Sequence, residues 1–137
     1  MVVDTSVIIH IYLEESDWQA SLAVLRKAER LLCSVASLIE AQAVITKRVR
    51  EPKTALKALD DVVENLNLEI VPFTLKQSRL AREAYLAYGK GQGHPAGLNY
   101  GDVMSYALAA DTGERLAFVG DDFNHTNLKV IRLPPNL

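Results

Sequence analysis

The chain has 137 residues, 49% of them hydrophobic, and this length and composition predict a single domain over residues 1–137 with one well-formed core. Its 15 Lys and Arg residues against 17 Asp and Glu residues give a formal net charge of -2, which argues against nucleic-acid binding through overall positive charge and leaves only a local basic face open. No apolar stretch reaches the roughly 18 residues needed to span a bilayer, and no secretion signal opens the chain, so we expect a cytoplasmic protein without membrane association.

The first half of the chain alternates between apolar runs and amphipathic stretches. Residues 1–4 predict a short strand, and residues 5–16 continue with helical spacing of apolar side chains. Residues 17–30 place their apolar side chains along one stripe, which predicts a second helix. The run LLCS at 31–34 indicates a second strand, in which the lone Cys33 is expected to be a buried free thiol. Helices are predicted over 36–49 and, starting at Pro52, over 52–66.

The second half repeats the alternation of strand and helix. A third strand is expected at 69–73, followed by a helix that begins at residue 74. Residues 89–99 hold four of the seven glycines and predict a loop, and a helix over 100–113 ends at Gly113 as a C-terminal cap. A fourth strand is expected at 116–120 and an edge strand at 129–133. This order predicts a mostly parallel sheet of four or five strands with helices on both faces, a three-layer α/β/α sandwich.

Acidic residues fall where such a sheet would place a site. In open α/β sheets, sites form in the crevice at the carboxyl ends of the strands. Asp4 ends the first strand, and Glu40 lies early in the helix after the second strand. Asp102 lies in the first turn after the glycine-rich loop, and Asp121 and Asp122 follow the fourth strand. We therefore expect these carboxylates to converge on one edge of the sheet.

Each acid taken alone also has a purely structural explanation. Ser37 and Glu40 fit a capping box, and Asn99 and Asp102 fit an Asn cap with an acid at the third helical position. Asp4 would orient the start of the first helix, and the acids after the fourth strand would be turn residues. A single acid therefore does not distinguish capping from chemistry.

Taken together, the acids point to a metal site. Four carboxylates at one strand edge repel each other, so they either take up protons or recruit a cation. Oxygen ligands without a His or Cys cluster favour Mg²⁺, or Mn²⁺ as a substitute, over zinc. Such a metal lowers the pKa of a bound water and neutralises a phosphodiester, while nearby helix N-termini help to seat phosphate. The chemistry indicated is hydrolysis of a nucleic-acid backbone.

Other candidate sites carry weaker signals. His10 lies among apolar residues of the first helix and is expected to be a packed histidine, whereas His94 and His125 lie in loops without metal-ligand spacing. Basic residues share one face of the helix that begins at residue 74, and either a solvated face or a phosphate-contacting rim would explain them.

Four segments carry a family resemblance that runs nearly end to end: VVDTSVII, SVASLIEAQAVI, the long block from EIVPF to MSYALA, and LAFVGDDFNHT. With these motifs the chain resembles PIN-domain ribonucleases, and specifically the VapC toxins of VapBC type II toxin-antitoxin systems. The resemblance implies a PIN-like α/β/α sandwich, an Mg²⁺-dependent endoribonuclease activity on RNA, inhibition by a cognate VapB antitoxin, and a homodimer.

The resemblance also implies roles for individual residues. Asp4 and Asp102 would be the metal-coordinating pair, Glu40 the third core acid, and Asp122 the acid after the fourth strand, with Asp121 beside it. Supporting positions are then the two residues after the first acid, which would position it or the scissile phosphate: Thr5 and Ser6.

One position departs from the family pattern. Relatives with this form of the last motif read T-D, whereas HTNL places Asn127 there. An amide can ligate a cation through its oxygen but brings no negative charge. Asn127 therefore leaves open a catalytically weakened PIN module that binds RNA or a partner protein. A second alternative is another Mg²⁺-dependent enzyme that uses the same crevice, such as a phosphatase or DNA nuclease.

Overall fold

The computed structural model describes residues 1–136. Its helices and strands follow one another in this order: β1 (Val2–Val3), α1 (Thr5–Tyr12), α2 (Trp18–Leu25), β2 (Leu31–Ser34), α3 (Val35–Thr46), α4 (Pro52–Asn65), β3 (Leu68–Val71), α5 (Leu75–Tyr88), α6 (Tyr100–Thr112), β4 (Leu116–Val119) and β5 (Val130–Leu133). Every predicted element is therefore present, in the predicted order.

Several predicted elements differ in length from the observed ones, among them the helix predicted over residues 5–16, which ends at Tyr12. The helix predicted over residues 17–30 covers only Trp18–Leu25, because the following amides of Lys27 and Ala28 bond three residues back and turn the chain toward β2. The third strand begins at Leu68 and ends at Val71, before Pro72, which has no N–H for the ladder.

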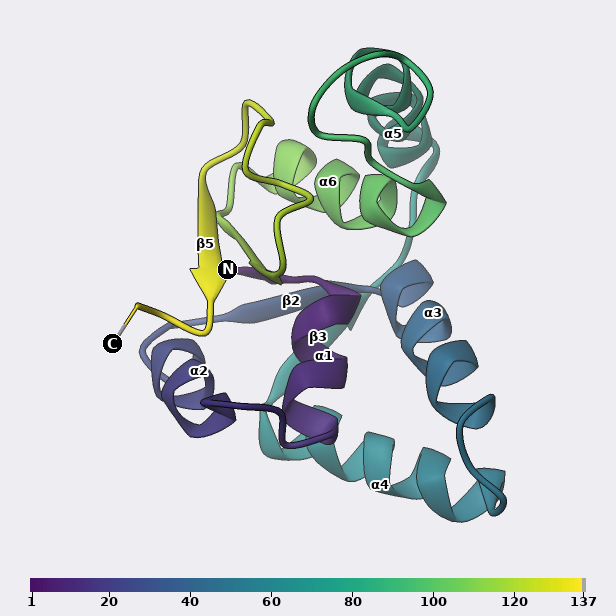
Figure 1. Cartoon of the computed structure of the whole chain (residues 1–137), viewed down its shortest axis with the longest axis vertical. Coiled ribbons are helices and arrows are strands. Elements are labelled where there is room, and N and C mark those ends of the chain that lie inside the picture. Colours follow the sequence, from purple (N-terminus) through teal and green to yellow (C-terminus); the bar gives the residue numbers. More distant parts are fainter. Residues whose placement is uncertain (137) are drawn as a thin grey trace.

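All five strands run parallel in the order β3-β2-β1-β4-β5 (Figure 1). The two-residue β1 lies at the centre, with Val2 paired to Leu32 on one side and to Leu116 on the other. The predicted edge strand is β5, which pairs with β4 along its whole length. The carboxyl ends of all strands consequently face the same edge of the sheet.

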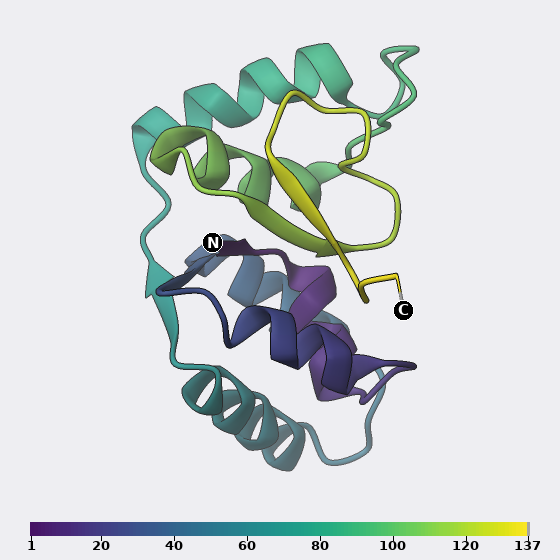
Figure 2. The same ribbon diagram turned by 90° about the vertical axis from the view of Figure 1, so that its left-hand side faces the viewer.

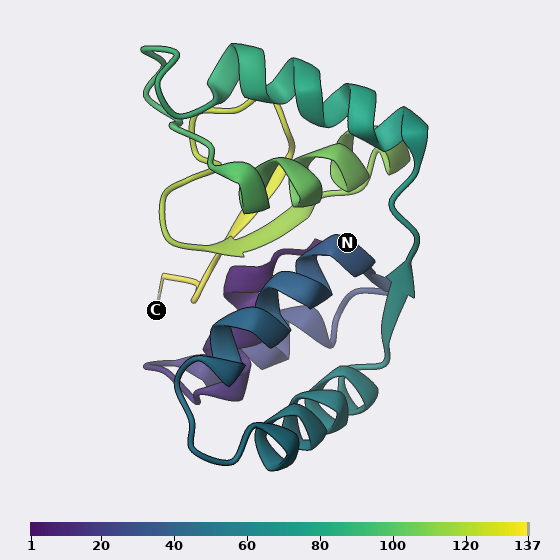
Figure 3. The ribbon, with the colours of Figure 1, turned by 90° about the vertical axis from the view of Figure 1, so that its right-hand side faces the viewer.

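Helices cover both faces of this sheet. Figures 2 and 3 show α5 and α6 on one side and α1, α2, α3 and α4 on the other. Successive strand residues enter opposite cores: Val2 and Phe118 pack with α5 and α6, whereas Val3 and Ala117 pack with the four-helix side. The predicted three-layer α/β/α sandwich is confirmed.

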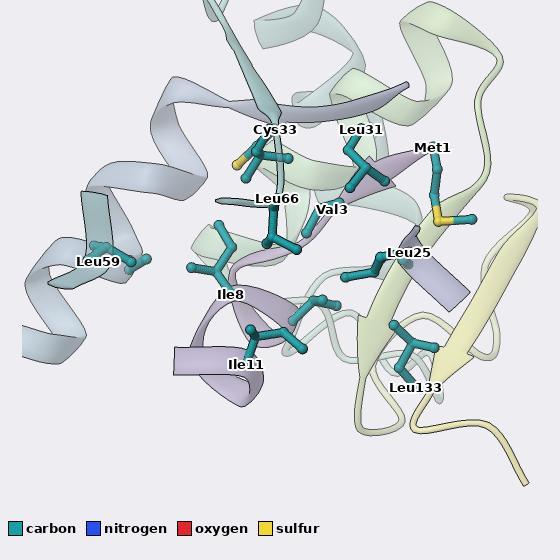
Figure 4. Packing of buried hydrophobic residues seen from close by; sticks show 14 of the residues in the cluster. Met1, Val3, Ile8, Ile11, Leu25, Leu31, Cys33, Leu59, Leu66 and Leu133 are labelled. Carbon is teal, nitrogen blue, oxygen red and sulfur yellow. The ribbon is translucent and has the colours of Figure 1, made fainter. Parts of the chain in front are cut away.

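The core on the four-helix side is aliphatic. Figure 4 shows Val3 of β1 next to Ile8 and Ile11 of α1, with Leu25 of α2 and Leu59 of α4 closing the cluster. Ile8, Leu25 and Leu59 are fully buried, so α1 is fixed firmly beneath the sheet. Since α1 begins directly after β1, this packing also fixes Asp4, which lies between them.

None of the helices within residues 1–136 has the length and apolar character required to cross a membrane.

Candidate active site

Asp4 occupies the junction between the central strand and α1. Its backbone N–H bonds to the carbonyl of Ala117 on β4, and its side chain caps α1 by accepting from the Ser6 amide at 3.0 Å. The Ser6 hydroxyl donates to the same carboxylate oxygen at 2.6 Å and accepts from the Val119 amide at 3.0 Å. The Ser6 hydroxyl therefore links the Asp4 carboxylate to the backbone of β4.

The other oxygen of Asp4 is held by α6. The hydroxyl of Ser105 donates to Oδ1 of Asp4 at 2.6 Å and lies 3.0 Å from the hydroxyl of Ser37 on α3. All three side chains are buried. Sequence reasoning missed Ser105, although its place three residues after Asp102, on the same face of a helix, is a signal that points to it.

Asp102 lies in the first turn of α6 and forms a capping box with Asn99. Its amide donates to the Asn99 side chain at 2.9 Å, and its Oδ2 accepts from the Asn99 amide at 3.0 Å. The predicted capping role is thus confirmed, but capping does not account for the electrostatics of the residue. Burial raises the pKa of Asp102 to about 7; the Asn99 hydrogen bond opposes that rise, and the negative charges of Asp122, Asp4 and Glu40 add to it.

Glu40 reaches the same place from α3. A Cβ atom added to Gly101 would overlap the Glu40 carboxylate, so this side chain lies directly against the first turn of α6. Its predicted capping box with Ser37 is wrong, because α3 begins at Val35 with Ser34 as its N-cap and Ser37 is already inside the helix. Within residues 1–136 the Glu40 carboxylate makes no hydrogen bond, which leaves it available for chemistry.

The two acids after β4 point to different neighbours. The pKa of Asp122 is raised by partial burial and then by the charges of Asp4 and Asp121. Asp121 also forms an ion pair with Arg132 of β5 at 3.0 Å and accepts from the Asn124 side-chain amide at 3.1 Å. The charges of Asp4, Glu40 and Asp122 therefore act on Asp102, whereas Asp121 acts on Asp122 and is paired with Arg132.

Two of the predicted supporting residues make contacts away from the acids. The hydroxyl of Thr5 donates to the backbone carbonyl of Ser37 at 3.0 Å and so ties α1 to α3. Oδ1 of Asn127 accepts from the hydroxyl of Tyr106 at 2.6 Å. Their contacts are structural rather than part of the acidic group.

The donor atoms of the acidic group suit a hard cation. They are carboxylate oxygens; burial is the main cause of the raised pKa values of Asp102 and Asp122, and the charges of neighbouring acids add to it, so a cation would oppose both rises. Among residues 1–136, no three His, Cys, Asp or Glu side chains already surround one point as metal ligands.

His10 is outside this group. It is 2% exposed, with Nε2 3.0 Å from the Ser21 hydroxyl and Nδ1 3.1 Å from a Glu15 carboxylate oxygen. These contacts join α1 to α2 and confirm the prediction of a packed histidine.

Comparison with known sequences gives matches along almost the whole chain. The family model described as PIN domain matches residues 1–129. The chain is 44% identical over 129 residues to Ribonuclease VapC28 of Mycobacterium tuberculosis, covering 94% of this chain and 96% of the relative. It is 39% identical over 134 residues to Ribonuclease VapC30 of the same species, covering 98% of this chain and 100% of the relative.

Solved structures share the fold at lower sequence identity. The crystal structure of VapBC2 from Rickettsia felis bound to a DNA fragment from their promoter has a TM-score of 0.77 at 18% identity, covering 96% of both chains. The structure of Mycobacterium tuberculosis VapC20, a Sarcin-Ricin loop cleaving toxin, has a TM-score of 0.71 at 14% identity, covering 93% of this chain and 95% of that chain.

Proposed function

Because the chain belongs to the PIN-domain family and is similar to VapC ribonucleases along almost its whole length, we propose that it is an Mg²⁺-dependent endoribonuclease and the toxin of a type II toxin-antitoxin system. Residues 1–137 would form one such domain. The observation that carries the proposal is the placement of acids around the start of α6. Asp4 accepts a hydrogen bond from Ser105 of α6, and Glu40 lies against Gly101 in its first turn. Asp102 lies in that turn itself, and the charge of Asp122 adds to the rise in its pKa.

Each acid would have a distinct task in this site. Asp4 and Asp102 are the proposed metal-binding pair, since hydrogen bonds from Ser6, Ser105 and the Asn99 amide fix the orientation of both carboxylates. Glu40, which has no hydrogen bond in the described chain, is the carboxylate best able to accept a proton from an attacking water. Asp122 completes the pocket from the segment after β4.

The metal itself supplies one part of the chemistry. When bound, Mg²⁺ (or Mn²⁺) would lower the pKa of a water and neutralise charge on the phosphodiester. The protein's contribution is to hold oxygen ligands in place and to bury Asp102, which raises its pKa so that a bound cation would stabilise its negative charge.

The partners follow from the relatives. Solved relatives of the same fold include VapBC complexes from Rickettsia felis and from Salmonella typhimurium. We infer that this chain is neutralised by a cognate VapB-type antitoxin, acts on RNA and forms a homodimer.

The alternative of a catalytically weakened binding module was considered because Asn127 stands where relatives carry an aspartate. That reason is weaker now, because the amide oxygen of Asn127 is engaged by Tyr106 and Asn127 makes no hydrogen bond to the four acids within residues 1–136. A phosphatase or DNA nuclease would use the same acids and differs only in substrate.

A cleavage assay with the purified chain tests the proposal. We expect Mg²⁺-dependent cleavage of single-stranded RNA, no cleavage of duplex DNA or phosphomonoesters, and loss of cleavage in Asp102→Asn. Asp60→Asn is the matched control, because Asp60 is an exposed acid on α4 and does not belong to the four acids of the proposed site. Undiminished cleavage by folded Asp102→Asn would contradict the site, and cleavage of phosphomonoesters alone would favour the phosphatase.

A further inference from the structure

The loop between β4 and β5, residues 120–129, carries Asp122 and is attached at several points. Phe123 is 1% exposed and packs edge-on against Phe118, with ring centroids 5.3 Å apart. On the β5 side, Arg132 donates to the carbonyl of Gly120 at 2.8 Å. Toward α6, the attachment is the 2.6 Å hydrogen bond from the Tyr106 hydroxyl to Oδ1 of Asn127. In the described chain no other side-chain hydrogen bond joins this loop to α6.

Tyr106 is itself rigidly held. Its side chain is 7% exposed, and its ring packs against Tyr88 with centroids 5.9 Å apart. Tyr88 in turn meets His94 of the glycine-rich segment in an edge-on contact at 4.9 Å. The hydroxyl of Tyr106 is therefore a fixed point on α6 to which the loop is attached.

Tyr106 also shares a helix face with the site. It lies one turn beyond Asp102, and residues four apart project from the same side of a helix. A single helix thus carries Asp102 directly and, through Asn127, anchors the loop that carries Asp122. The two acids are therefore linked through α6 by the bond between Tyr106 and Asn127.

We propose that Asn127 is a positioning residue, whose oxygen accepts from Tyr106 and thereby fixes the loop so that Asp122 faces Asp4 and Asp102. In this role a carboxylate at position 127 would serve as well as an amide, because both offer an acceptor oxygen. The consequence for metal binding rests on the proposed function, whereas the anchor itself does not.

Hydrogen exchange of the metal-free protein tests the anchor. Tyr106→Phe and Asn127→Ala should speed exchange of the Asn124 and Thr126 amides, which bond within the loop, by roughly three- to ten-fold. Asn127→Asp should exchange like the parent. Tyr88→Phe is the matched control, because within residues 1–136 the Tyr88 hydroxyl has no hydrogen bond. Unchanged exchange in Tyr106→Phe and Asn127→Ala would overturn the anchor, whether or not the parent cleaves RNA.

The Mg²⁺ concentration that gives half-maximal RNA cleavage tests the consequence. Tyr106→Phe and Asn127→Ala should each raise this Mg²⁺ concentration by roughly three- to ten-fold, and the double variant should raise it no further than either single variant. Asn127→Asp should keep the concentration of the parent. If Asn127 were a metal ligand, Tyr106→Phe would free its oxygen and lower this concentration. If the bond were merely structural, the melting temperature would fall while the concentration stayed constant. Either result would overturn the positioning role.

Discussion

At the scale of single residues, the burial of Asp102 makes the stability of the folded protein depend on pH. Its pKa is about 7 in the folded protein, against roughly 3.9 for an unperturbed aspartate. Between these values the folded state holds more protons than the unfolded state, so the contribution of Asp102 to stability is present below pH 4 and is lost as the pH rises toward 7. Above pH 7 the free energy of unfolding is therefore lower than below pH 4 by up to about 4 kcal/mol.

Replacing this acid should therefore stabilise the metal-free protein. We expect Asp102→Asn to raise the melting temperature at pH 7.5 by several degrees and to have little effect at pH 4, because Asn is neutral and keeps an oxygen for the Asn99 amide. Thermal unfolding in EDTA across this pH range is the measurement, with Asp60→Asn as the control. Parallel pH profiles for the parent and Asp102→Asn would contradict the buried charge.

At the scale of elements, the close approach of α3 and α6 depends on Gly101. A Cβ at this position would meet the carboxylate of Glu40, the end of a flexible side chain, and not the helix backbone of α3. Gly101→Ala should hence displace Glu40 at little cost to the fold. Because alanine favours a helix over glycine by roughly 0.5–1 kcal/mol, stability should hold or rise.

The same substitution should separate stability from activity. We expect Gly101→Ala to reduce RNA cleavage to a level near that of Glu40→Gln, and the double variant to lose little more, because both changes act on one carboxylate. Urea unfolding and cleavage rates of the three variants provide the comparison. Full activity in Gly101→Ala would show that the position of Glu40 against α6 is not required.

The elements also show which features could be predicted from the sequence. Apolar runs and helical stripes locate the strands and helices, and the strand ends then locate Asp4 and Asp122. Local patterns fail where a contact with a residue far along the chain determines the role of a side chain. Ser37 fits a capping box as a four-residue motif, yet its hydroxyl meets Ser105. The bond from Ser105 to Asp4 joins residues 101 positions apart, which no local spacing reveals.

At the scale of the whole molecule, metal binding should be linked to folding. A cation that binds only the folded state stabilises it in proportion to the logarithm of its concentration once the site is saturated. Millimolar Mg²⁺ should therefore raise the melting temperature of the parent, and the increase should be smaller in Asp4→Asn. Thermal unfolding with Mg²⁺ and with a matched sodium salt measures this difference. An equal shift in both proteins would argue against Asp4 as a ligand.

Family membership and architecture could be predicted at this scale because the motifs and the alternation of strand and helix extend along nearly the whole chain. The completely parallel arrangement and the central place of β1 could not, since strand order depends on which strands pair in three dimensions. The positions of Asp4 and Asp122 at one edge of the sheet could be predicted, because both follow parallel strands, whose carboxyl ends share that edge.

The central position of β1 has a consequence for the cell that makes this protein. Val2 and Val3 pair with Leu116 and Ala117 of β4, more than a hundred residues further along the chain. During synthesis Asp4 therefore emerges long before Asp102 and Asp122. A nascent chain that has not yet reached Asp122 cannot assemble the four acids, so the nuclease site forms only after β4 has been made.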